Sequence, residues 1–255
     1  MRRREYLLGS ALFAVGLSGC TTTADRRTMF QQSATTAGTD QATGTSTADG
    51  SGTEASPTGE ADGEPVIELG ESELVVDESR FSTDVYVSVA VENVGAGHSG
   101  TLEVVADWYN DAGEYMGNDS AFLNSLGPGE IWAARVYYLG GSGEEVNDYE
   151  VAGEYNVEPP DMNPDGLSLL ESELQVGEDE AVVSGRVENR RTEPVSYIEA
   201  TAKLYDAEGV VLGDEWTNVT DVPAGEVWAF ELTWLAFGRA QDVAEHSMWL
   251  EDSAL

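Results

Sequence analysis

The residue types that most often carry catalytic chemistry are scarce in this chain. Its 255 residues include one cysteine, Cys20, and two histidines, His98 and His246. Neither histidine lies in a phrase that presents a nucleophile on a sharp turn, and transition-metal sites need several His or Cys ligands close together. We therefore predict no catalytic residue. We expect His98 to be solvated and His246 to lie on the surface of a strand.

One run of oxygen-bearing side chains has a spacing that suits calcium. Asp161, Asn163 and Asp165 precede Gly166 in the order that opens an oxygen-rich calcium loop. The acid expected at the twelfth position is missing, because Ser172 stands there. A polar turn between two domains explains the same residues equally well. Calcium is thus the one cofactor that we consider, and no other is predicted.

Two N-x-S/T sequons begin at Asn118 and Asn218. They could accept N-linked glycans if the chain is exported and these segments are exposed. The alternative is chance occurrence in turns that are rich in Asn and Thr.

The first residues have the features of an export signal. Three arginines precede an apolar run from Tyr6 to Leu17. This run is too short to cross a hydrocarbon core of about 30 Å, but it suits the apolar region of a signal peptide. Arg3 and Arg4 resemble the pair of a twin-arginine export signal.

The lone cysteine ends this segment. The stretch Leu17, Ser18, Gly19 and Cys20 resembles the lipobox of prokaryotic lipoproteins. That resemblance implies cleavage before Cys20 and attachment of lipid to its sulfur. We therefore expect residues 1–19 to be a signal peptide, and the mature chain to be anchored at the extracytoplasmic face of the cell membrane. A cysteine without consequence is the alternative.

The charge of the chain is strongly one-sided. It contains 48 acidic and 12 basic residues, a formal net charge of −36, and Lys203 is its only lysine. Self-repulsion of this size weakens a compact fold, but in molar salt the Debye length falls to about 3 Å and the effect fades. The composition resembles that of proteins from salt-loving archaea. Phosphate backbones would be repelled, so nucleic acid is excluded as a partner.

Composition divides the chain into segments. Residues 20–64 are mostly Thr, Ser, Ala, Gly, Asp and Glu, with Met29 and Phe30 as their large apolar residues. Such a segment buries too little surface to offset its ordering entropy, so we expect a disordered tether. Two folded domains are expected at 65–158 and 167–255, joined by a linker at 159–166.

An internal repeat supports this division. Val91-Glu92-Asn93 recurs 96 residues later as Val187-Glu188-Asn189, and Gly129 to Ala133 recurs as Gly225 to Ala229 with one conservative change. Two copies indicate duplicated domains rather than a solenoid.

The apolar residues of each copy alternate with a period of two, which predicts strands. Strands are expected around residues 85–92, 102–108 and 132–138, and at the equivalent positions of the second copy. Short strands between Gly, Asn and Asp turns predict an all-β chain of two tandem immunoglobulin-like antiparallel sandwiches, each of about seven strands. Four tryptophans are expected to face the core: Trp108, Trp132, Trp228 and Trp234.

A family resemblance rests on the hairpin corner of each copy. The second copy reads Ala202-Lys203-Leu204-Tyr205-Asp206 with Gly209 following, and later Pro223-Ala224-Gly225-Glu226. This phrase resembles the FxLYD domain, an immunoglobulin-like β-sandwich of prokaryotic surface proteins. The first copy matches it less well, with Tyr109, Asn110 and Gly113 at the corner. Both copies have Ala where the family has Phe. The resemblance implies a fold and no shared reaction.

Three functions are compatible with these features. The favoured one is a lipid-anchored surface protein that presents non-catalytic binding or spacer modules to an unknown surface protein or glycan. The second is a ligand-binding accessory lipoprotein of a transporter or envelope polymer. The third, an exported hydrolase, needs a carboxylate pair that the sequence does not single out.

Overall fold

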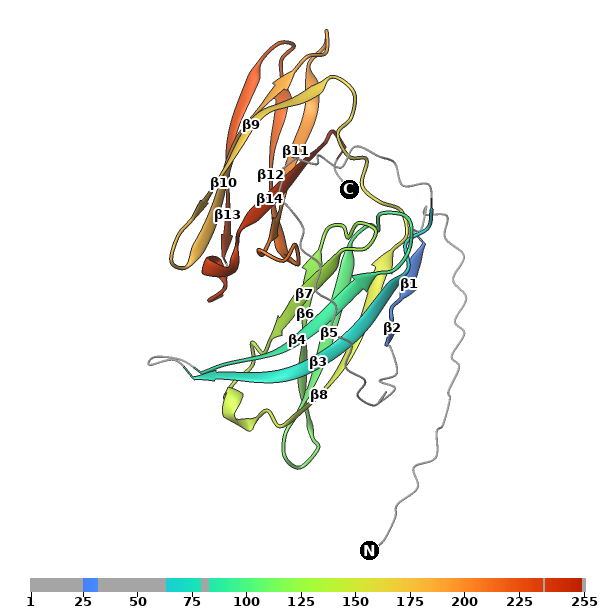
Figure 1. The fold of residues 1–255 in the computed structure, drawn as a ribbon, viewed down its shortest axis with the longest axis vertical. Coiled ribbons are helices and arrows are strands. Elements are labelled where there is room, and N and C mark those ends of the chain that lie inside the picture. The colour runs from blue at the N-terminus through green and yellow to red at the C-terminus, as the bar shows by residue number, and fades with distance from the viewer. Residues whose placement is uncertain (1–24, 32–62, 79–82, 236, 254–255) are drawn as a thin grey trace, which may run out of the picture.

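The computed structural model describes residues 25–31, 63–78, 83–235 and 237–253. This part of the chain is all-β, with no α-helix and two single-turn 3₁₀ segments, η1 (Gly143–Glu145) and η2 (Ala240–Asp242). The strands form antiparallel sheets that pack as immunoglobulin-like β-sandwiches (Figure 1). The all-β prediction is therefore confirmed.

Six strands make up the first half of the described chain, between residues 67 and 156. They are β3 (Ile67–Glu78), β4 (Thr83–Asn93), β5 (Leu102–Tyr109), β6 (Tyr115–Leu123), β7 (Ile131–Tyr137) and β8 (Asp148–Asn156). One sheet has the order β8-β5-β6 and the other has the order β7-β4-β3.

Six further strands make up the second half, between residues 167 and 251. They are β9 (Leu167–Val176), β10 (Glu180–Asn189), β11 (Val195–Tyr205), β12 (Val211–Val222), β13 (Val227–Leu235) and β14 (Glu245–Glu251). Their sheets have the orders β14-β11-β12 and β13-β10-β9, which is the strand order of the first half. The division into tandem domains with a linker at 159–166 remains a prediction.

The period of two places one apolar face of each strand in a core. On β5, Leu102, Val104, Ala106 and Trp108 are all fully buried. On β11, Ile198, Ala200, Ala202 and Leu204 are buried in the same way. The two sets belong to separate hydrophobic clusters, one in each half. The four tryptophans expected in the core lie in or against these clusters.

Each half has a buried asparagine at the end of its second strand. The Nδ2 amide of Asn93 donates to the carbonyls of Gly97 and Leu126, and its Oδ1 accepts from the N–H of Gly95. Asn189, 96 residues later, donates to the carbonyls of Glu193, Val222 and Pro223. One side chain thus satisfies buried backbone groups from several loops, which fixes how those loops leave the sheet.

The hairpin corners also follow the sequence prediction. The Oδ1 atom of Asp206 accepts from the N–H groups of Glu208 and Val210, at 2.9 and 2.8 Å. Asn110 makes the same two bonds with Ala112 and Glu114. Two glycines have the positive φ that the turns require, 73° at Gly113 and 81° at Gly209.

The expected number of strands was wrong. The described residues form six strands between residues 67 and 156, and six between 167 and 251, rather than about seven; the sheets of the first half also include β1 and β2 from residues 25–31. After β4, where a further strand could pair, residues 94–100 include three glycines and fold around the Asn93 side chain instead. Backbone groups in this loop bond to loops and to that amide, so no sheet ladder forms.

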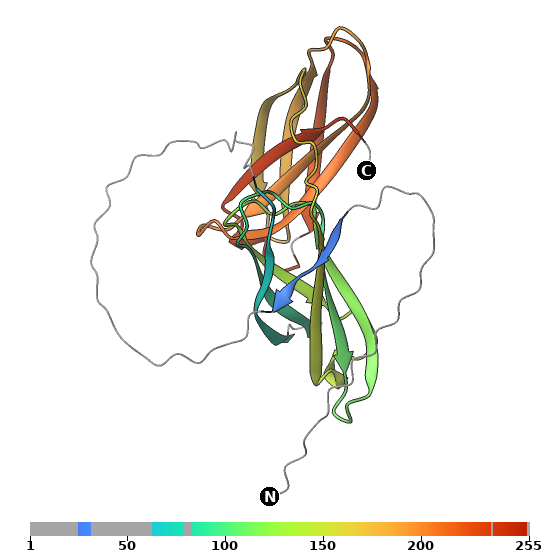
Figure 2. The same ribbon diagram turned by 90° about the vertical axis from the view of Figure 1, so that its right-hand side faces the viewer.

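A disordered tether over the whole of 20–64 was also wrong, because residues 25–31 form strands. β1 (Arg26–Thr28) pairs antiparallel with β8, and β2 (Phe30–Gln31) pairs parallel with β3, so this segment lies along the first half (Figure 2). The Met29 side chain is 5% exposed and belongs to the first core cluster. Burial of this side chain and the backbone bonds offset the ordering entropy that composition alone suggested would prevail.

Among the described residues, no helix has the length and apolar character needed to cross a membrane.

We predict that Asn189→Ala lowers the free energy of unfolding by about 2–5 kcal/mol, because one buried and two partly buried carbonyls lose their donor. Chemical denaturation followed by tryptophan fluorescence measures this change. Asn147→Ala is the matched control, since Asn147 is exposed, and it should change stability by less than about 0.5 kcal/mol. Equal effects of the two substitutions would contradict the role given to the buried amide.

Candidate functional site

The two halves meet in a contact that we call the joint. Strands β11 and β12 and the β13–η2 connection of the second half contact β7 and the β6–β7 connection of the first. Val211 of β12 pairs with Trp132 of β7 as a single parallel bridge, which joins strands of both halves into one seven-stranded sheet. The Val211 side chain is fully buried in the first core cluster.

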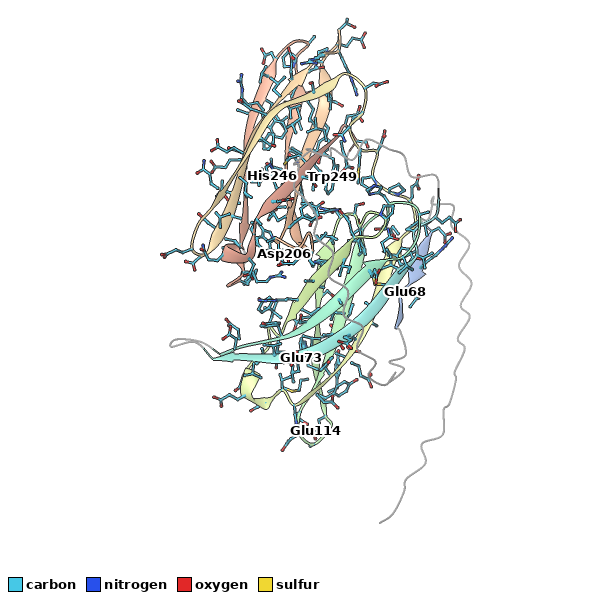
Figure 3. All side chains as sticks on the ribbon, viewed as in Figure 1. Glu68, Glu73, Glu114, Asp206, His246 and Trp249 are labelled. Atoms are coloured by element: carbon cyan, nitrogen blue, oxygen red, sulfur yellow. The ribbon has the colours of Figure 1, made fainter. Side chains whose placement is uncertain are left out.

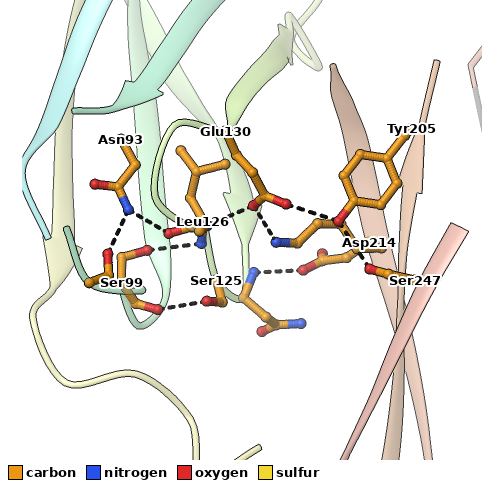
Figure 4. Close-up of polar contacts among 12 residues, drawn as sticks. Asn93, Ser99, Ser125, Leu126, Glu130, Tyr205, Asp214 and Ser247 are labelled. Carbon is orange, nitrogen blue, oxygen red and sulfur yellow. Dashed lines mark hydrogen bonds and ion pairs between the residues drawn. The ribbon is translucent and has the colours of Figure 1, made fainter. Parts of the chain in front are cut away.

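A buried ion pair lies at the centre of the joint. The Nζ atom of Lys203, whose residue is 3% exposed, lies 2.7 Å from Oε2 of Glu130. The hydroxyl of Tyr205 donates to Oε1 of the same carboxylate at 2.9 Å, and it also contacts Ser247 Oγ at 3.0 Å (Figure 4). The ammonium also lies 5.7 Å from the centre of the Trp249 ring.

Local sequence explains why Glu130 reaches this position. It follows Pro128 and Gly129, and Gly129 has a φ of 74°, so the chain turns tightly before β7 begins. The carboxylate also accepts from the N–H of Gly127 at 2.6 Å, which holds it over the turn. The equivalent Glu226 of the second half is exposed. One motif thus supplies a joint residue in one copy and a surface residue in the other.

Further polar contacts cross the joint. Asp214 of β12 accepts from the backbone N–H of Asn124 at 2.7 Å. The guanidinium of Arg239 donates across the joint to the carbonyl of Ala133 at 2.8 Å, and within the second half to that of Leu212 at 2.9 Å. The bonds to Asn124 and Ala133 tie backbone of the first half to side chains of the second, so a rotation at the joint would leave buried groups without partners.

The joint shifts the pKa values of two carboxyl groups in opposite directions. Burial raises the pKa of Asp214 to about 6, and the N–H of Asn124 and the charge of Lys203 only partly offset it. For Glu130 burial is again the largest influence and raises the pKa. The ion pair with Lys203 and the bonds from Gly127 and Tyr205 outweigh it, so the pKa is lowered. Burial also raises the pKa of the Tyr205 hydroxyl.

The histidines do not form a catalytic set. His98 is half-buried at the joint rather than solvated as expected, and its Nδ1 atom has no hydrogen-bond partner among the described residues. Burial, followed by the charge of Lys203, lowers its pKa. His246 lies on β14, where its Nε2 contacts Ser172 Oγ at 2.9 Å, and burial lowers its pKa (Figure 3). The two rings therefore belong to different surroundings.

The family-motif residues take different roles in the two halves. Tyr205 bonds across the joint, whereas the equivalent Tyr109 bonds to Glu150 near the surface. Lys203, which the sequence analysis passed over as a site residue, is the centre of the joint. The sequence did contain an indication of this role. The only lysine in a chain of net charge −36 lies between the core residues Ala202 and Leu204, and therefore on the opposite face of its strand.

The calcium loop uses its side chains for structure. Asn163 has a φ of 58°, and its Oδ1 accepts from the N–H of Leu250. The carbonyl of Asp165 accepts from Arg191, which brings a cation to the loop. No group of three or more His, Cys, Asp or Glu side chains suited to a metal occurs among the described residues. Calcium binding by Asp161, Asn163 and Asp165 remains a prediction.

The predicted modification sites divide into two groups. Asn118 on β6 and Asn218 on β12 have exposed side chains, so both sequons are accessible. Glycosylation of them remains a prediction. The export and lipidation residues lie outside the described part of the chain: Arg3, Arg4, Leu17, Ser18, Gly19 and Cys20.

No family model and no curated protein matches the chain. The FxLYD assignment therefore remains a prediction.

Solved structures resemble it weakly. A β-glucuronidase of Bacteroides uniformis is 15% identical with a TM-score of 0.21, over 60% of this chain and 22% of that one. The tandem CBM22 domains of Paenibacillus barcinonensis Xyn10C are 9% identical with a TM-score of 0.16, over 72% and 84%. The chain thus spans under a quarter of the length of that glucuronidase, and these likenesses carry no argument about function.

We predict that Asp214→Asn stabilises the protein at neutral pH. The folded pKa of about 6 exceeds the ordinary value of 3.8. The stabilisation from a protonated Asp214 is therefore complete below pH 4 and is lost as pH rises through 6. Calorimetry in about 2 M KCl should show the Asn variant melting roughly 2–6 °C higher than the parent at pH 7.5. At pH 4 the two should melt together.

Asp111→Asn is the control, because Asp111 is exposed at a hairpin tip. It should leave the pH dependence of melting unchanged. A parent and an Asp214→Asn variant that melt alike at both pH values would contradict the buried-carboxyl assignment.

Proposed function

We propose that this chain is a lipid-anchored, extracytoplasmic protein in which two immunoglobulin-like sandwiches act as one rigid, non-catalytic module. The observation that carries the proposal is the joint. A buried lysine–glutamate pair with hydrogen bonds on both partners restricts the relative orientation of the halves, because breaking it leaves a charge without its partner in low dielectric. A flexible pair of independent binding domains would leave this surface polar and wet.

The lipid anchor is inferred from the resemblance of residues 1–20 to a lipoprotein signal. The structure adds a constraint to that inference. Residues 25–31 lie along the first sandwich, and only five residue steps separate Asp25 from Cys20. Five extended residues span at most about 18 Å. A lipid on Cys20 would therefore hold the first sandwich close to the membrane surface, and not at the end of a 45-residue tether.

Orientation follows from the same contact. β1 pairs with β8 at one edge of the first sandwich, and its basic residues pair with acids there: Arg26 with Glu103 and Glu154, and Arg27 with Glu64. Asp25 lies at the end of β8 that leads toward the second half, where its carbonyl accepts from the N–H of Val157. We therefore expect a lipid on Cys20 to hold this end of the first sandwich, and the joint with it, near the membrane.

We predict that Cys20→Ser releases the protein from the membrane. The parent protein should pellet with membranes and have the mass of a chain that begins at a lipid-modified Cys20, since acyl chains supply about 0.8 kcal/mol per buried methylene. The variant should be recovered from the soluble fraction. Thr21→Ser is the control and should pellet as the parent does. A parent protein found in the cytosol with residues 1–19 intact would overturn the anchor.

We predict that rigidity depends on Glu130. Cys20→Ser leaves no thiol in the chain, so spin labels can be placed at Glu114→Cys and Glu193→Cys, two exposed positions in loops at the ends remote from the joint. Pulsed electron paramagnetic resonance should give one narrow distance distribution, and Glu130→Ala should broaden it. Glu226→Ala, the same change at the equivalent exposed residue, should not. A broad distribution in the parent would contradict the rigid module.

A further inference from the structure

A surface groove lies beside the joint, between β6 and β7 of the first half and β12, β13 and the following loop of the second. Its volume is about 270 Å³. Six of its lining residues carry the inference: Phe122, Arg135, Tyr137, Trp234, Phe237 and Arg239. Two contacts between the halves also involve these residues: Arg239 bonds to the carbonyl of Ala133, and Tyr137 bonds to the carbonyl of Phe237.

The groove exposes aromatic rings. Phe237 is 68% exposed and Phe122 is 58% exposed, in contrast to the tryptophans of the cores. The Phe237 ring lies 5.2 Å from the ring of Tyr137, which lies 5.0 Å from that of Tyr86. Exposed rings that gather in one hollow, supported from below by further rings, mark a binding surface rather than scattered surface residues.

The backbone at Phe237 is strained in a way that presents its ring. Its φ is 45°, a left-handed conformation that costs a bulky residue energy. The hydroxyl of Tyr137 donates to its carbonyl at 3.0 Å and holds that conformation. Strain that the surrounding structure maintains is found most often at sites with a function.

Two arginines in the groove have no carboxylate partner. Five of the seven arginines in the described residues form ion pairs: Arg26, Arg27, Arg186, Arg190 and Arg191. The other two are Arg135 and Arg239. The Arg135 guanidinium lies 4.7 Å from the centre of the Tyr86 ring. The Arg239 residue is 8% exposed, and its Nε–H has no hydrogen-bond partner among the described residues. In so acidic a chain, two unpaired guanidiniums side by side form a local site for an anion.

The acids near this pair limit the charge of that anion. Asp214 lines the groove, and Asp206, Glu208 and Asp242 line a neighbouring hollow that the same arginines border. Asp214 already accepts from the backbone N–H of Asn124, and its carboxylate can also accept from a hydroxyl group in the groove. A doubly charged phosphate would be repelled about twice as strongly as a carboxylate by the field of the whole chain. The lining therefore favours one carboxylate together with hydroxyl groups.

The size of the groove also limits the occupant. At about 270 Å³ it lies just below the range of about 300–1,000 Å³ for small-molecule pockets. A stable protein partner would need about 800 Å² of its own surface buried. One or two sugar rings match the space, and a sugar has both an apolar ring face for an aromatic side chain and hydroxyls for Asp214.

We propose that this groove binds a carboxylate-bearing sugar, with its carboxylate at Arg135, where the buried charge of Arg239 adds to the attraction, and its apolar ring face on Phe237 or Phe122. The site goes beyond the anchored module and does not depend on the lipid. A surface protein with this site would hold, or be held by, an acidic glycan.

The test uses the purified full chain in about 2 M KCl, where long-range repulsion is screened. Galacturonate, which has one ring and one carboxylate, is the probe, and its methyl ester, which lacks the charge, is the matched ligand. Trp132 and Trp234 line the groove, so intrinsic fluorescence reports binding, and calorimetry checks it. We expect the acid to bind and the ester to bind at least about 10-fold more weakly.

Two variants test the assigned residues. Arg135→Gln should weaken galacturonate binding about 10- to 100-fold, the usual effect of losing a hydrogen bond to a charged group. Phe122→Ala should weaken it about 5- to 10-fold, because its ring is exposed and the fold does not depend on it. The matched controls are Arg186→Gln and Tyr115→Ala, which remove an arginine and an exposed aromatic ring from other surfaces and should bind as the parent does.

Three outcomes would overturn the proposal. The first is no heat or fluorescence change with galacturonate at about 10 mM, the weak limit of specific binding. The second is equal binding of the acid and its ester. The third is inorganic phosphate competing as well as the sugar does, which would make the groove a general anion site. Melting temperatures of each variant separate loss of binding from loss of folding.

Discussion

The structure depends most on one buried contact between charges, that of Lys203 with Glu130. In a chain of net charge −36 an exposed lysine would meet many carboxylates, yet the only lysine is 3% exposed and is paired with one of them. Burial costs both charges their hydration, so the pair contributes little to stability by itself. Its effect is on geometry, because only one orientation of the halves gives the ammonium, the carboxylate and the Tyr205 hydroxyl their partners.

This contact also explains why matching sequence phrases have unequal surroundings. Tyr205 and Tyr109 stand at the same place in their hairpins, but the outer face of β11 is covered by the first half and that of β5 is not. Glu130 and Glu226 each follow a turn that ends in glycine, Gly129 or Gly225, and of the two only Glu130 bonds to a side chain of the other half. In each matched pair, both residues serve the fold of their own half. One of them, Tyr205 or Glu130, also bonds across the joint.

Much of the fold could be predicted because its causes are local. Alternating apolar residues placed the β5 and β11 faces correctly, and Asn110, Asp206 and the glycines after them determine their turns within five residues. The joint could not be predicted in this way, since Lys203 and Glu130 are 73 residues apart and neither position has a local preference for the other. The ordering of residues 25–31 was missed for a related reason. Burial of the Met29 side chain offsets the ordering entropy of this polar segment only because the segment can pair with the edge of β8, a strand that is distant in the sequence.

The distribution of positive charge links the joint, the N-terminal segment and the groove. An acidic surface leaves few cations, so each one that a structure retains has a strong electrostatic consequence. Arg26 and Arg27 join residues 25–31 to the acids of the first half, and Lys203 fixes the joint. Arg135 and Arg239 have no carboxylate within ion-pair distance among the described residues, although Asp214 and Asp242 lie near. Evolution toward acidity would readily have supplied such a partner. These two guanidiniums lie in a groove with exposed aromatic rings. This is the strongest reason to propose a binding site beside the joint, and the contact between the halves at the joint forms that groove.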